Sequence, residues 1–456
     1  MKACHRVRPV FDDPNLVSTA GLVPVLRLAE TAGLHEELAG LTVPSPNAAA
    51  KTVCVIGGML AGADSIDGLD VLRHGGMPRL FSGVRAPSTL GTHLRAFTHG
   101  HVQQLDRAAS VTLAGLAGRV PGLLAGGGAG GMVLLDIDDT VREVHGYAKQ
   151  AAAFGYTGVR GLNAIVATTS TPIAAPVITA ARLRRGNSAS AAGVGQLAAR
   201  AIGATRRAGA LGQLLVRADS AFYGHALIGA VLAARSWFSV TARMDPKVRA
   251  AISGIAADAW TPIRYRQAVF DEQTGQWISD AEVAEVDFVA FTGRRKADHV
   301  PCRLVVRRVA RLNPASVPAG QGELFTAWRY HAFITNSTLS TIDADVTHRG
   351  HAIVEQVIAE LKAGPLAHLP SGSYAANAAW LACAVLAFNL ARAAAVAAGI
   401  TTARWATLRT KIIAVAARIA ATGRRLVIHL PRDWPWAQAW RLLFDTATSP
   451  PAATTP

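Results

Sequence analysis

Acidic residues follow two apolar stretches that have the pattern of buried strands. In VLLDIDD, the two-residue period of a strand places Asp136 and Asp138 on one face and Asp139 on the other. The stretch QLLVRADSAFYG delivers Asp219 at the end of its apolar run, just before a turn and a helix. Because an ionised carboxylate is costly to bury without a cation, this pattern predicts a metal site at a sheet edge. A turn or a helix cap is the structural alternative for each motif.

A third carboxylate comes from the segment that begins with His348 and continues as AIVEQVIAELK, which has the pattern of a helix. At about 100° per residue, an arc of roughly 60° contains four of its polar residues, His348, His351, Glu355 and Lys362. Glu360 points away from this arc. We therefore interpret Glu355 as the site candidate and Glu360 as a solvated residue, with a surface ion pair of Glu355 as the structural alternative.

The first 125 or so residues have the three- and four-residue apolar spacing of helices, in LVPVLRLAETAGL, AAAKTVCVIGGMLAGA and PSTLGTHLRAFTHGHVQQLD. Ser88 is a plausible cap for the last of these. Its exposed face is expected to carry His93, Arg95, His99 and Gln103. Both a helix-turn-helix DNA reader and an ordinary helical bundle fit this pattern.

The pattern changes after the glycine-rich stretch LLAGGGAGG, which lacks the GxxxxGK[ST] motif of a nucleotide-binding loop. Strands then alternate with helices, which predicts a mixed α/β sheet. From about Trp260 to Trp328 the chain becomes polar and β-rich, which predicts an inserted antiparallel subdomain. The α/β pattern resumes with RYHAFITN, and a basic segment containing several tryptophans follows from Thr401.

Composition and charge favour a globular protein that binds a polyanion. Half of the residues are hydrophobic, and 46 Lys and Arg stand against 30 Asp and Glu, for a net charge of +16. Arginine forks bind phosphate well, which favours nucleic acid as the partner, although high genomic GC content would also favour Arg over Lys. The four cysteines are scattered singly, which fits a reducing cytoplasm and predicts no zinc knuckle or disulfide framework.

Neither a signal peptide nor a membrane span is expected. The N-terminus MKACHRVRPV is charged but has no apolar run behind it. The apolar stretch from Ala375 to Ile400 is interrupted by Asn377, Asn389 and Arg392, so we interpret it as a buried core helix.

The spacing His348-x2-His351-x3-Glu355-x6-Lys362 resembles the Tyr-x2-Arg-x3-Glu-x6-Lys signature of DDE-type bacterial insertion-sequence transposases related to the Tn5 type. Both leading residues of the signature are histidine here. The segments LDIDDT, VHGYAKQAAAFGYTGVRGLNAIVA, RLRRGNSAS, VRADSAFYG and AANAAWLACAVLAFNLAR resemble the insertion-sequence thirteen-eighty group in order and spacing. The resemblance covers most of the chain.

The resemblance implies an α/β fold: an RNase H-like mixed sheet with a β-rich insertion between the second Asp and the Glu, preceded by an all-α N-terminal DNA-binding domain. The expected segments are 1–127 for the helical domain, 128–258 and 328–400 for the two parts of the catalytic core, 259–327 for the insertion, and 401–456 for the basic C-terminal segment.

The resemblance also assigns roles to individual residues. Asp138, Asp219 and Glu355 become the catalytic, metal-binding carboxylates, with Asp136 as the alternative for the first. Lys362 is expected to contact phosphate. Histidine is only partly charged at neutral pH, which weakens the phosphate-binding role of the signature positions His348 and His351. The other expected DNA contacts are Arg349, Arg184, Arg185, Arg294 and Arg295.

The implied activity is metal-dependent cleavage of transposon ends and strand transfer into target DNA, with two Mg²⁺ ions for which Mn²⁺ can substitute. The implied partners are transposon-end and target double-stranded DNA, bound by a homodimer in the bacterial cytoplasm at the nucleoid, with no membrane and no nucleotide cofactor. Two alternatives remain: an RNase H-like nuclease or resolvase without strand transfer, and an inactive DNA-binding protein descended from a transposase.

Overall fold

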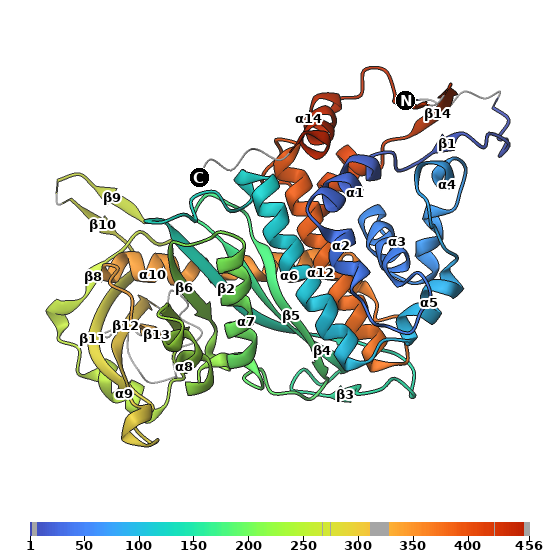
Figure 1. Ribbon diagram of the computed structural model, residues 1–456. Coiled ribbons are helices and arrows are strands. Elements are labelled where there is room, and N and C mark those ends of the chain that lie inside the picture. The colour runs from blue at the N-terminus through green and yellow to red at the C-terminus, as the bar shows by residue number, and fades with distance from the viewer. Residues whose placement is uncertain (2–6, 267, 274, 311–327, 424, 451–456) are drawn as a thin grey trace.

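The computed structural model describes residues 1, 7–266, 268–273, 275–310, 328–423 and 425–450. Its centre is a mixed sheet (Figure 1). Strands β2 (Met132–Glu143), β4 (Arg160–Ser170) and β5 (Val177–Arg185) pair antiparallel, whereas β6 (Gln213–Ala218) and β7 (Trp237–Thr241) run parallel to β2. The order β5-β4-β2-β6-β7 confirms the expected mixed α/β sheet and is that of an RNase H-like fold.

The β-rich insertion extends this sheet and is not a separate layer. Strand β13 (Trp328–Thr335) pairs antiparallel with β7, and β12 (Val300–Ala310), β11 (Ala281–Ala290) and β8 (Thr261–Pro262) follow outward. Within the described residues the sheet has ten strands, with β3 (Ala153–Phe154) on β4. A two-stranded hairpin projects from its end, formed by β9 (Val269–Asp271) and β10 (Gln276–Ile278) (Figure 1). The insertion is antiparallel, as expected, and the part of it at 311–327 lies outside the described residues.

Helices cover both faces of the sheet. On one face, Thr169 of β4 contacts Thr205 of α7 (Val194–Arg207), with 2.6 Å between the two hydroxyl oxygens. The other face carries α10 (Thr341–Arg349) and α11 (Ile353–Lys362), which are joined by a single 3-10 turn. Helices α8 (His225–Ala233) and α9 (Pro246–Ser253) follow β6 and β7 in the chain.

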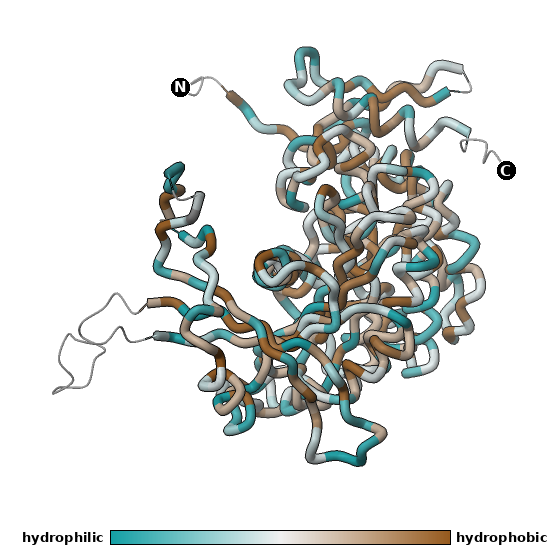
Figure 2. Tube along the Cα trace, turned by 90° about the vertical axis from the view of Figure 1, so that its left-hand side faces the viewer, coloured by the Kyte–Doolittle hydropathy of each residue, from teal (hydrophilic) through white to brown (hydrophobic). Residues whose placement is uncertain are grey.

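The N-terminal helices share one hydrophobic core with the rest of the chain. Helix α12 (Tyr374–Ala397) packs against α1 (Leu22–Thr31), α3 (Ala48–Ala61) and α6 (His99–Arg119), and also against strand β5. The hydrophobic trace gathers in the interior of the molecule, as Figure 2 shows. The N-terminal region is therefore packed into the catalytic fold, and a separate all-α domain is not confirmed. Its smaller helices are α2 (Leu34–Ala39), α4 (Met77–Leu80) and α5 (Pro87–Arg95).

Segments from the N-terminal and C-terminal regions also pack against each other. Strand β1 (Leu16–Val17) pairs with β14 (Ala417–Thr422), which forms a hairpin with β15 (Arg425–His429). Helix α14 (Ala437–Thr448) packs on α1, after the short helix α13 (Trp405–Leu408). Among the described residues, one helix has the length and composition to cross a membrane, and this is α12, of which 94% of the apolar window is buried inside the protein. The expectation of a buried core helix is confirmed.

The predicted helix at 87–106 is in fact two helices. Helix α5 begins at Pro87 without a side-chain cap, so Ser88 is not its cap, and Thr98 begins α6 with a capping box. His93, which was expected on the exposed face, is 1% exposed and lies 3.1 Å from the Thr52 hydroxyl. The break rotates the two halves relative to each other, and this places His93 in the core.

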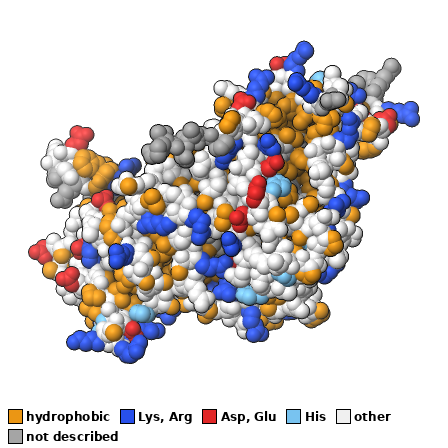
Figure 3. All heavy atoms as spheres, in the orientation of Figure 1, with side chains coloured by type: hydrophobic (Ala, Val, Ile, Leu, Met, Phe, Trp, Pro, Cys, Tyr) orange, Lys and Arg blue, Asp and Glu red, His pale blue; other side chains and the backbone are white. Residues whose placement is uncertain are grey.

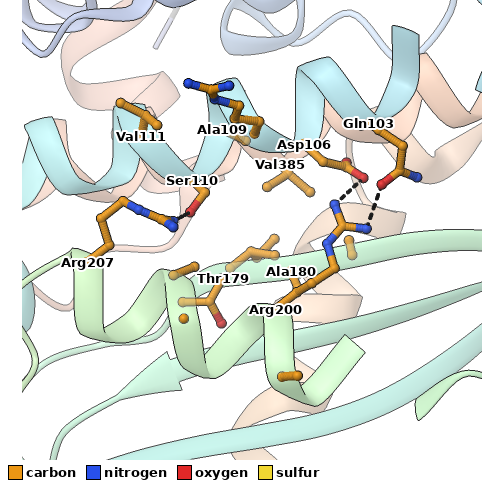
Figure 4. A pocket seen from close by; sticks show the side chains of 16 residues that line it. Gln103, Asp106, Ala109, Ser110, Val111, Thr179, Ala180, Arg200, Arg207 and Val385 are labelled. Atoms are coloured by element: carbon orange, nitrogen blue, oxygen red, sulfur yellow. Dashed lines mark hydrogen bonds and ion pairs between the residues drawn. The ribbon is translucent and has the colours of Figure 1, made fainter. Parts of the chain in front are cut away.

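A polar clasp joins α6 to α7 across a cavity of about 550 Å³ (Figure 4). Arg200 donates hydrogen bonds to Gln103 at 2.9 Å and to Asp106 at 2.8 Å, and Arg207 donates to the Ser110 hydroxyl. Burial raises the pKa of Asp106, and the positive charge of Arg200 opposes this shift. The clasp fixes the last N-terminal helix to the catalytic sheet through α7.

Candidate active site

Two candidate carboxylates lie at the same level on neighbouring parallel strands. Strands β2 and β6 pair Asp136 with Arg217 and Ile137 with Ala218. The next step along both strands brings Asp138 beside Asp219. Because side chains two residues apart share a face, both carboxylates lie on the face of the Asp136–Arg217 ion pair. The same face carries α10 and α11.

The carboxyl group of Asp138 has an unusual proton affinity. Burial, together with the negative charges of Asp219, Asp139 and Glu355, raises its pKa to about 6. A hydrogen bond of 2.7 Å from the Asp139 amide opposes the shift. Three acidic side chains therefore act on Asp138, and among the described residues no Lys, Arg or His side chain forms an ion pair with it.

Asp219 directly follows β6, where the strand ends. Its carboxylate accepts a hydrogen bond of 3.0 Å from the Ala221 amide and caps a short 3-10 turn. Burial raises the pKa of Asp219, and the negative charge of Asp139 adds to this, whereas the Ala221 amide and His351 oppose it. The helix-cap alternative is thus partly correct, but the cap occupies only one of the two carboxylate oxygens.

Glu355 lies in the first turn of α11 and is exposed. It makes no hydrogen bond or ion pair with any side chain in the described part of the chain, so the surface ion pair that was its alternative is not formed. Its negative charge acts on Asp138, as does that of Asp219, so β6 and α11 each bring one carboxylate into the electrostatic field of Asp138 on β2. Glu360, which was expected to be solvated, is not: it accepts from the Trp405 amide at 2.6 Å and pairs with Arg392.

Asp136, the alternative first carboxylate, is occupied structurally. Its side chain is fully buried, and both of its oxygens accept from Arg217, at 2.6 and 2.7 Å. A carboxylate held in this way has no free oxygen directed to a metal or to DNA. The geometry therefore favours Asp138 over Asp136.

Arg184 was expected to bind DNA, and the structure corrects this. The side chain is 7% exposed and forms an ion pair with Asp139 on the opposite face of the sheet. It also donates to the Asn163 side chain at 2.9 Å, and to the carbonyls of Ala189, Ser190 and Ala192. All of its donors face protein acceptors, so Arg184 holds the loop after β5 in place.

His348 is a second correction among the expected DNA contacts. The ring is 7% exposed, stacks on Phe333 at 4.1 Å, and lies within hydrogen-bond distance of the hydroxyls of Ser239 (2.8 Å) and Thr241 (3.0 Å). Burial, and the charges of His351 and nearby arginines, lower its pKa well below 6.5. His348 is therefore a neutral core residue and not a phosphate ligand.

The remaining signature residues differ in their surroundings. His351 is half-buried, its Nδ1 lies 2.9 Å from the His348 carbonyl, and its positive charge acts on Asp219. Lys362 is half-buried at the end of α11. Arg349 pairs with Asp345 at 2.8 Å and lies over the Tyr265 ring, although 30% of its side chain is still exposed.

Three other expected DNA contacts are exposed: Arg185 at the end of β5, and Arg294 and Arg295 in the loop between β11 and β12. Arg295 makes a weak ion pair of 3.5 Å with Asp298 while its own side chain is 86% exposed. Their guanidinium groups are accessible to phosphate.

The carboxylates are compatible with a divalent ion, although no group of three His, Cys, Asp or Glu among the described residues is close enough to hold one alone. Mg²⁺ keeps several waters and binds through one or two carboxylates together with substrate phosphates, so it needs no closed protein cage. The donors are hard oxygens, and the raised pKa of Asp138 marks negative charge that a cation would compensate. Mg²⁺ and Mn²⁺ suit such donors.

Sequence reasoning missed two residues beside this site. Arg217 precedes Asp219 by two positions on the same strand face, and Gly350 lies against it: a Cβ atom on Gly350 would be 2.9 Å from Arg217 Nη1. The two-residue period that selected Asp136 and Asp138 also places Arg217 opposite Asp136, so this partner was detectable once the strands were aligned.

A sheet of this order, with Asp138 midway along β2 and Asp219 directly after β6, is that of an RNase H-like fold. The family model described as transposase DDE domain group 1 matches residues 127–449, which is most of the chain, so the protein belongs to this family of DDE transposases. The match starts at the glycine-rich stretch and leaves the N-terminal helices outside. No curated protein matches the chain.

Proposed function

We propose that this protein is a cut-and-paste transposase that cleaves the ends of a mobile DNA element and joins them to target DNA, and that Asp138, Asp219 and Glu355 are its catalytic carboxylates. The observation that supports it best is the register of β2 and β6, which brings Asp138 beside Asp219 in a family that processes DNA. The electrostatic contact of Glu355 with Asp138 adds the third group.

The carboxylates would hold two Mg²⁺ ions, which when bound activate a water or a DNA 3′ hydroxyl and stabilise the leaving oxygen. Asp138 and Asp219 supply ligands from a rigid sheet, and Glu355 supplies one from the helix above it. His351 and Lys362, which belong to the helical segment of Glu355, would orient the phosphate. Because no residue acts as a covalent nucleophile, the same site would serve both hydrolysis and strand transfer.

Double-stranded DNA would bind over a broad basic surface. Lys and Arg side chains are spread over the face seen in Figure 3 and outnumber the acidic ones there. Arg185, Arg294 and Arg295 are exposed arginines that would contribute to DNA binding. We further propose that the protein belongs to the insertion-sequence thirteen-eighty group, acts as a homodimer because two ends are cut together, and works at the bacterial nucleoid.

A cleavage and joining assay tests this function. The purified protein is incubated with labelled duplex DNA from the flanks of its own gene, a target plasmid, and Mg²⁺ or Mn²⁺. Wild type should nick at the element end and join it to the plasmid. Asp138→Asn, Asp219→Asn and Glu355→Gln should each lose at least about 1,000-fold in rate while still binding the DNA. Glu143→Gln, an exposed acid on β2, is the matched control and should keep full activity.

The outcomes separate the alternatives. Cleavage without joined product, dependent on all three carboxylates, would indicate a nuclease or resolvase. Specific binding without cleavage in either metal would indicate an inactive descendant of a transposase. Full activity in the Asp138 and Glu355 variants would defeat the residue assignment.

A further inference from the structure

Arg217 contacts the neighbouring strand of the site and the helix that precedes the one carrying Glu355. It lies on β6, two residues before Asp219, and is 2% exposed. Its Nε and Nη2 donate to the two oxygens of Asp136 on β2, at 2.6 and 2.7 Å. Its Nη1 donates to the Thr347 carbonyl in the last turn of α10, at 2.5 Å. One guanidinium therefore ties two strands to the helical segment that leads to Glu355.

The third bond sets the position of Glu355. Thr347 belongs to α10, and only the 3-10 turn Gly350–Ala352 separates this helix from α11. Gly350, which begins that turn, lies against Nη1, and a Cβ atom there would approach it to 2.9 Å. The turn thus rests directly on the guanidinium, without an intervening side chain, and any displacement of Arg217 moves the start of α11.

We propose that Arg217 is a positioning residue that sets the distance of Glu355 from Asp138 and Asp219. The proposal rests on the function proposed above. Asp136 is its anchor: the bidentate ion pair fixes the plane of the guanidinium, and this plane directs Nη1 at the Thr347 carbonyl. The ion pair lies two residues before Asp138 on β2 and two residues before Asp219 on β6. It therefore links the two strands directly beside the candidate carboxylates.

A lysine at position 217 cannot make the same set of contacts as the arginine. A lysine ammonium is a compact charge on a flexible stem, and it lacks the planar fork that grips both oxygens of Asp136 while a third donor reaches across to α10. Arg217→Lys should therefore keep the charge pair but release α10 and α11. The variant separates positioning from charge balance.

The structure offers a control in the insertion. Arg308 on β12 forms an ion pair with Glu282 on β11, with 2.5 Å between Nη2 and the carboxylate. The pair joins two neighbouring strands, as Arg217 and Asp136 do, but among the described residues it makes no hydrogen bond to 341–362 and contacts none of the candidate carboxylates. Arg308→Lys should leave the site unchanged.

The test compares intact wild type, Arg217→Lys, Gly350→Ala and Arg308→Lys by three measurements: Mn²⁺ affinity by calorimetry, amide hydrogen exchange over 341–362, and steady-state cleavage. In Arg217→Lys and Gly350→Ala, Mn²⁺ affinity should fall about 10-fold and kcat about 10- to 100-fold, with KM for DNA within about twofold. Exchange over 341–362 should accelerate in both variants. Arg308→Lys should match wild type in every measurement.

A folded Arg217→Lys protein with unchanged Mn²⁺ affinity and unchanged exchange overturns the proposal. If the lysine variant does not fold, Gly350→Ala decides in the same way, because it displaces the guanidinium without removing a charge. Metal affinity and hydrogen exchange can be measured without turnover. If the wild-type protein cleaves no DNA, the proposed function is wrong, but these two measurements still decide the role of Arg217.

Discussion

Asp138, midway along β2, stands beside Asp219, which directly follows the parallel strand β6; both lie one step beyond the paired residues Ile137 and Ala218. Two carboxylates in this position repel each other, and burial removes the water that would screen them. The chain tolerates this arrangement although it opposes folding. Unfavourable interactions of this kind are typical of functional sites, where residues needed for function reduce the folding stability.

Replacing Asp138 should therefore stabilise the metal-free protein. Its pKa is raised from 3.8 to about 6, so the folded state binds the proton more tightly than the unfolded state. Stability accordingly falls as pH rises from about 4 to 6. Asp138→Asn should raise the free energy of unfolding by about 2 kcal/mol at pH 7.5 and change it little at pH 4, as measured by urea denaturation. Equal effects at both pH values would contradict this prediction.

Two buried histidines should have the opposite effect on the pH dependence of stability. Burial lowers the pKa of His93 to about 4, and that of His348 well below 6.5. The unfolded state then binds more protons, so their stabilisation is complete above pH 6.5 and is lost as pH falls below it. His93→Gln should reduce the stability loss between pH 7 and 4.5 by about 2 kcal/mol. His35→Gln, at an exposed position, is the control and should leave that loss unchanged.

The neighbours Arg184 and Arg185 should give opposite phenotypes. Arg184→Met strands the buried Asp139, so unfolding free energy should drop by about 3–5 kcal/mol. Arg185→Ala removes an exposed charge, so stability should stay within about 0.5 kcal/mol while the salt dependence of DNA binding weakens by about one phosphate contact. Thermal unfolding and DNA titrations at several salt concentrations check both. A stable Arg184→Met protein with weakened DNA binding would reverse the assignment.

Removing the N-terminal helices should expose the core. The fragment 127–449 matches the family model but lacks α1, α3 and α6, which cover α12. Loss of this cover leaves a long apolar helix in contact with water, so the fragment should aggregate or bind a hydrophobic dye strongly. A soluble, cooperatively unfolding fragment would show instead that the N-terminal region is an independent domain.

Local periodicity was sufficient to predict much of this fold. The apolar runs that end in Asp138 and Asp219 form β2 and β6, and the segment of Glu355 is helical, because a strand or helix pattern is written into neighbouring residues. The mixed sheet and the antiparallel insertion follow from the same patterns. The register that places β2 beside β6 could not be predicted from these patterns, because it depends on pairing between segments about 80 residues apart in sequence.

The errors concern side chains whose partners are distant in sequence. His348 has the spacing of a surface residue, but Ser239, Thr241 and Phe333 enclose it. Arg184 is of a residue type that often contacts DNA, but it forms a buried ion pair with Asp139. Burial of a polar residue depends on which hydrogen-bonding groups meet it in three dimensions, and a single sequence does not display them.

The position of α12 in the chain has a consequence for biosynthesis. Helices α1, α3 and α6 leave the ribosome well before the helix they enclose, Tyr374–Ala397. Until that helix is made, their apolar faces have no permanent cover, and the nascent chain depends on chaperones or on temporary contacts. A premature stop codon before Tyr374 therefore yields a polypeptide without its central helix, which cellular proteases would remove.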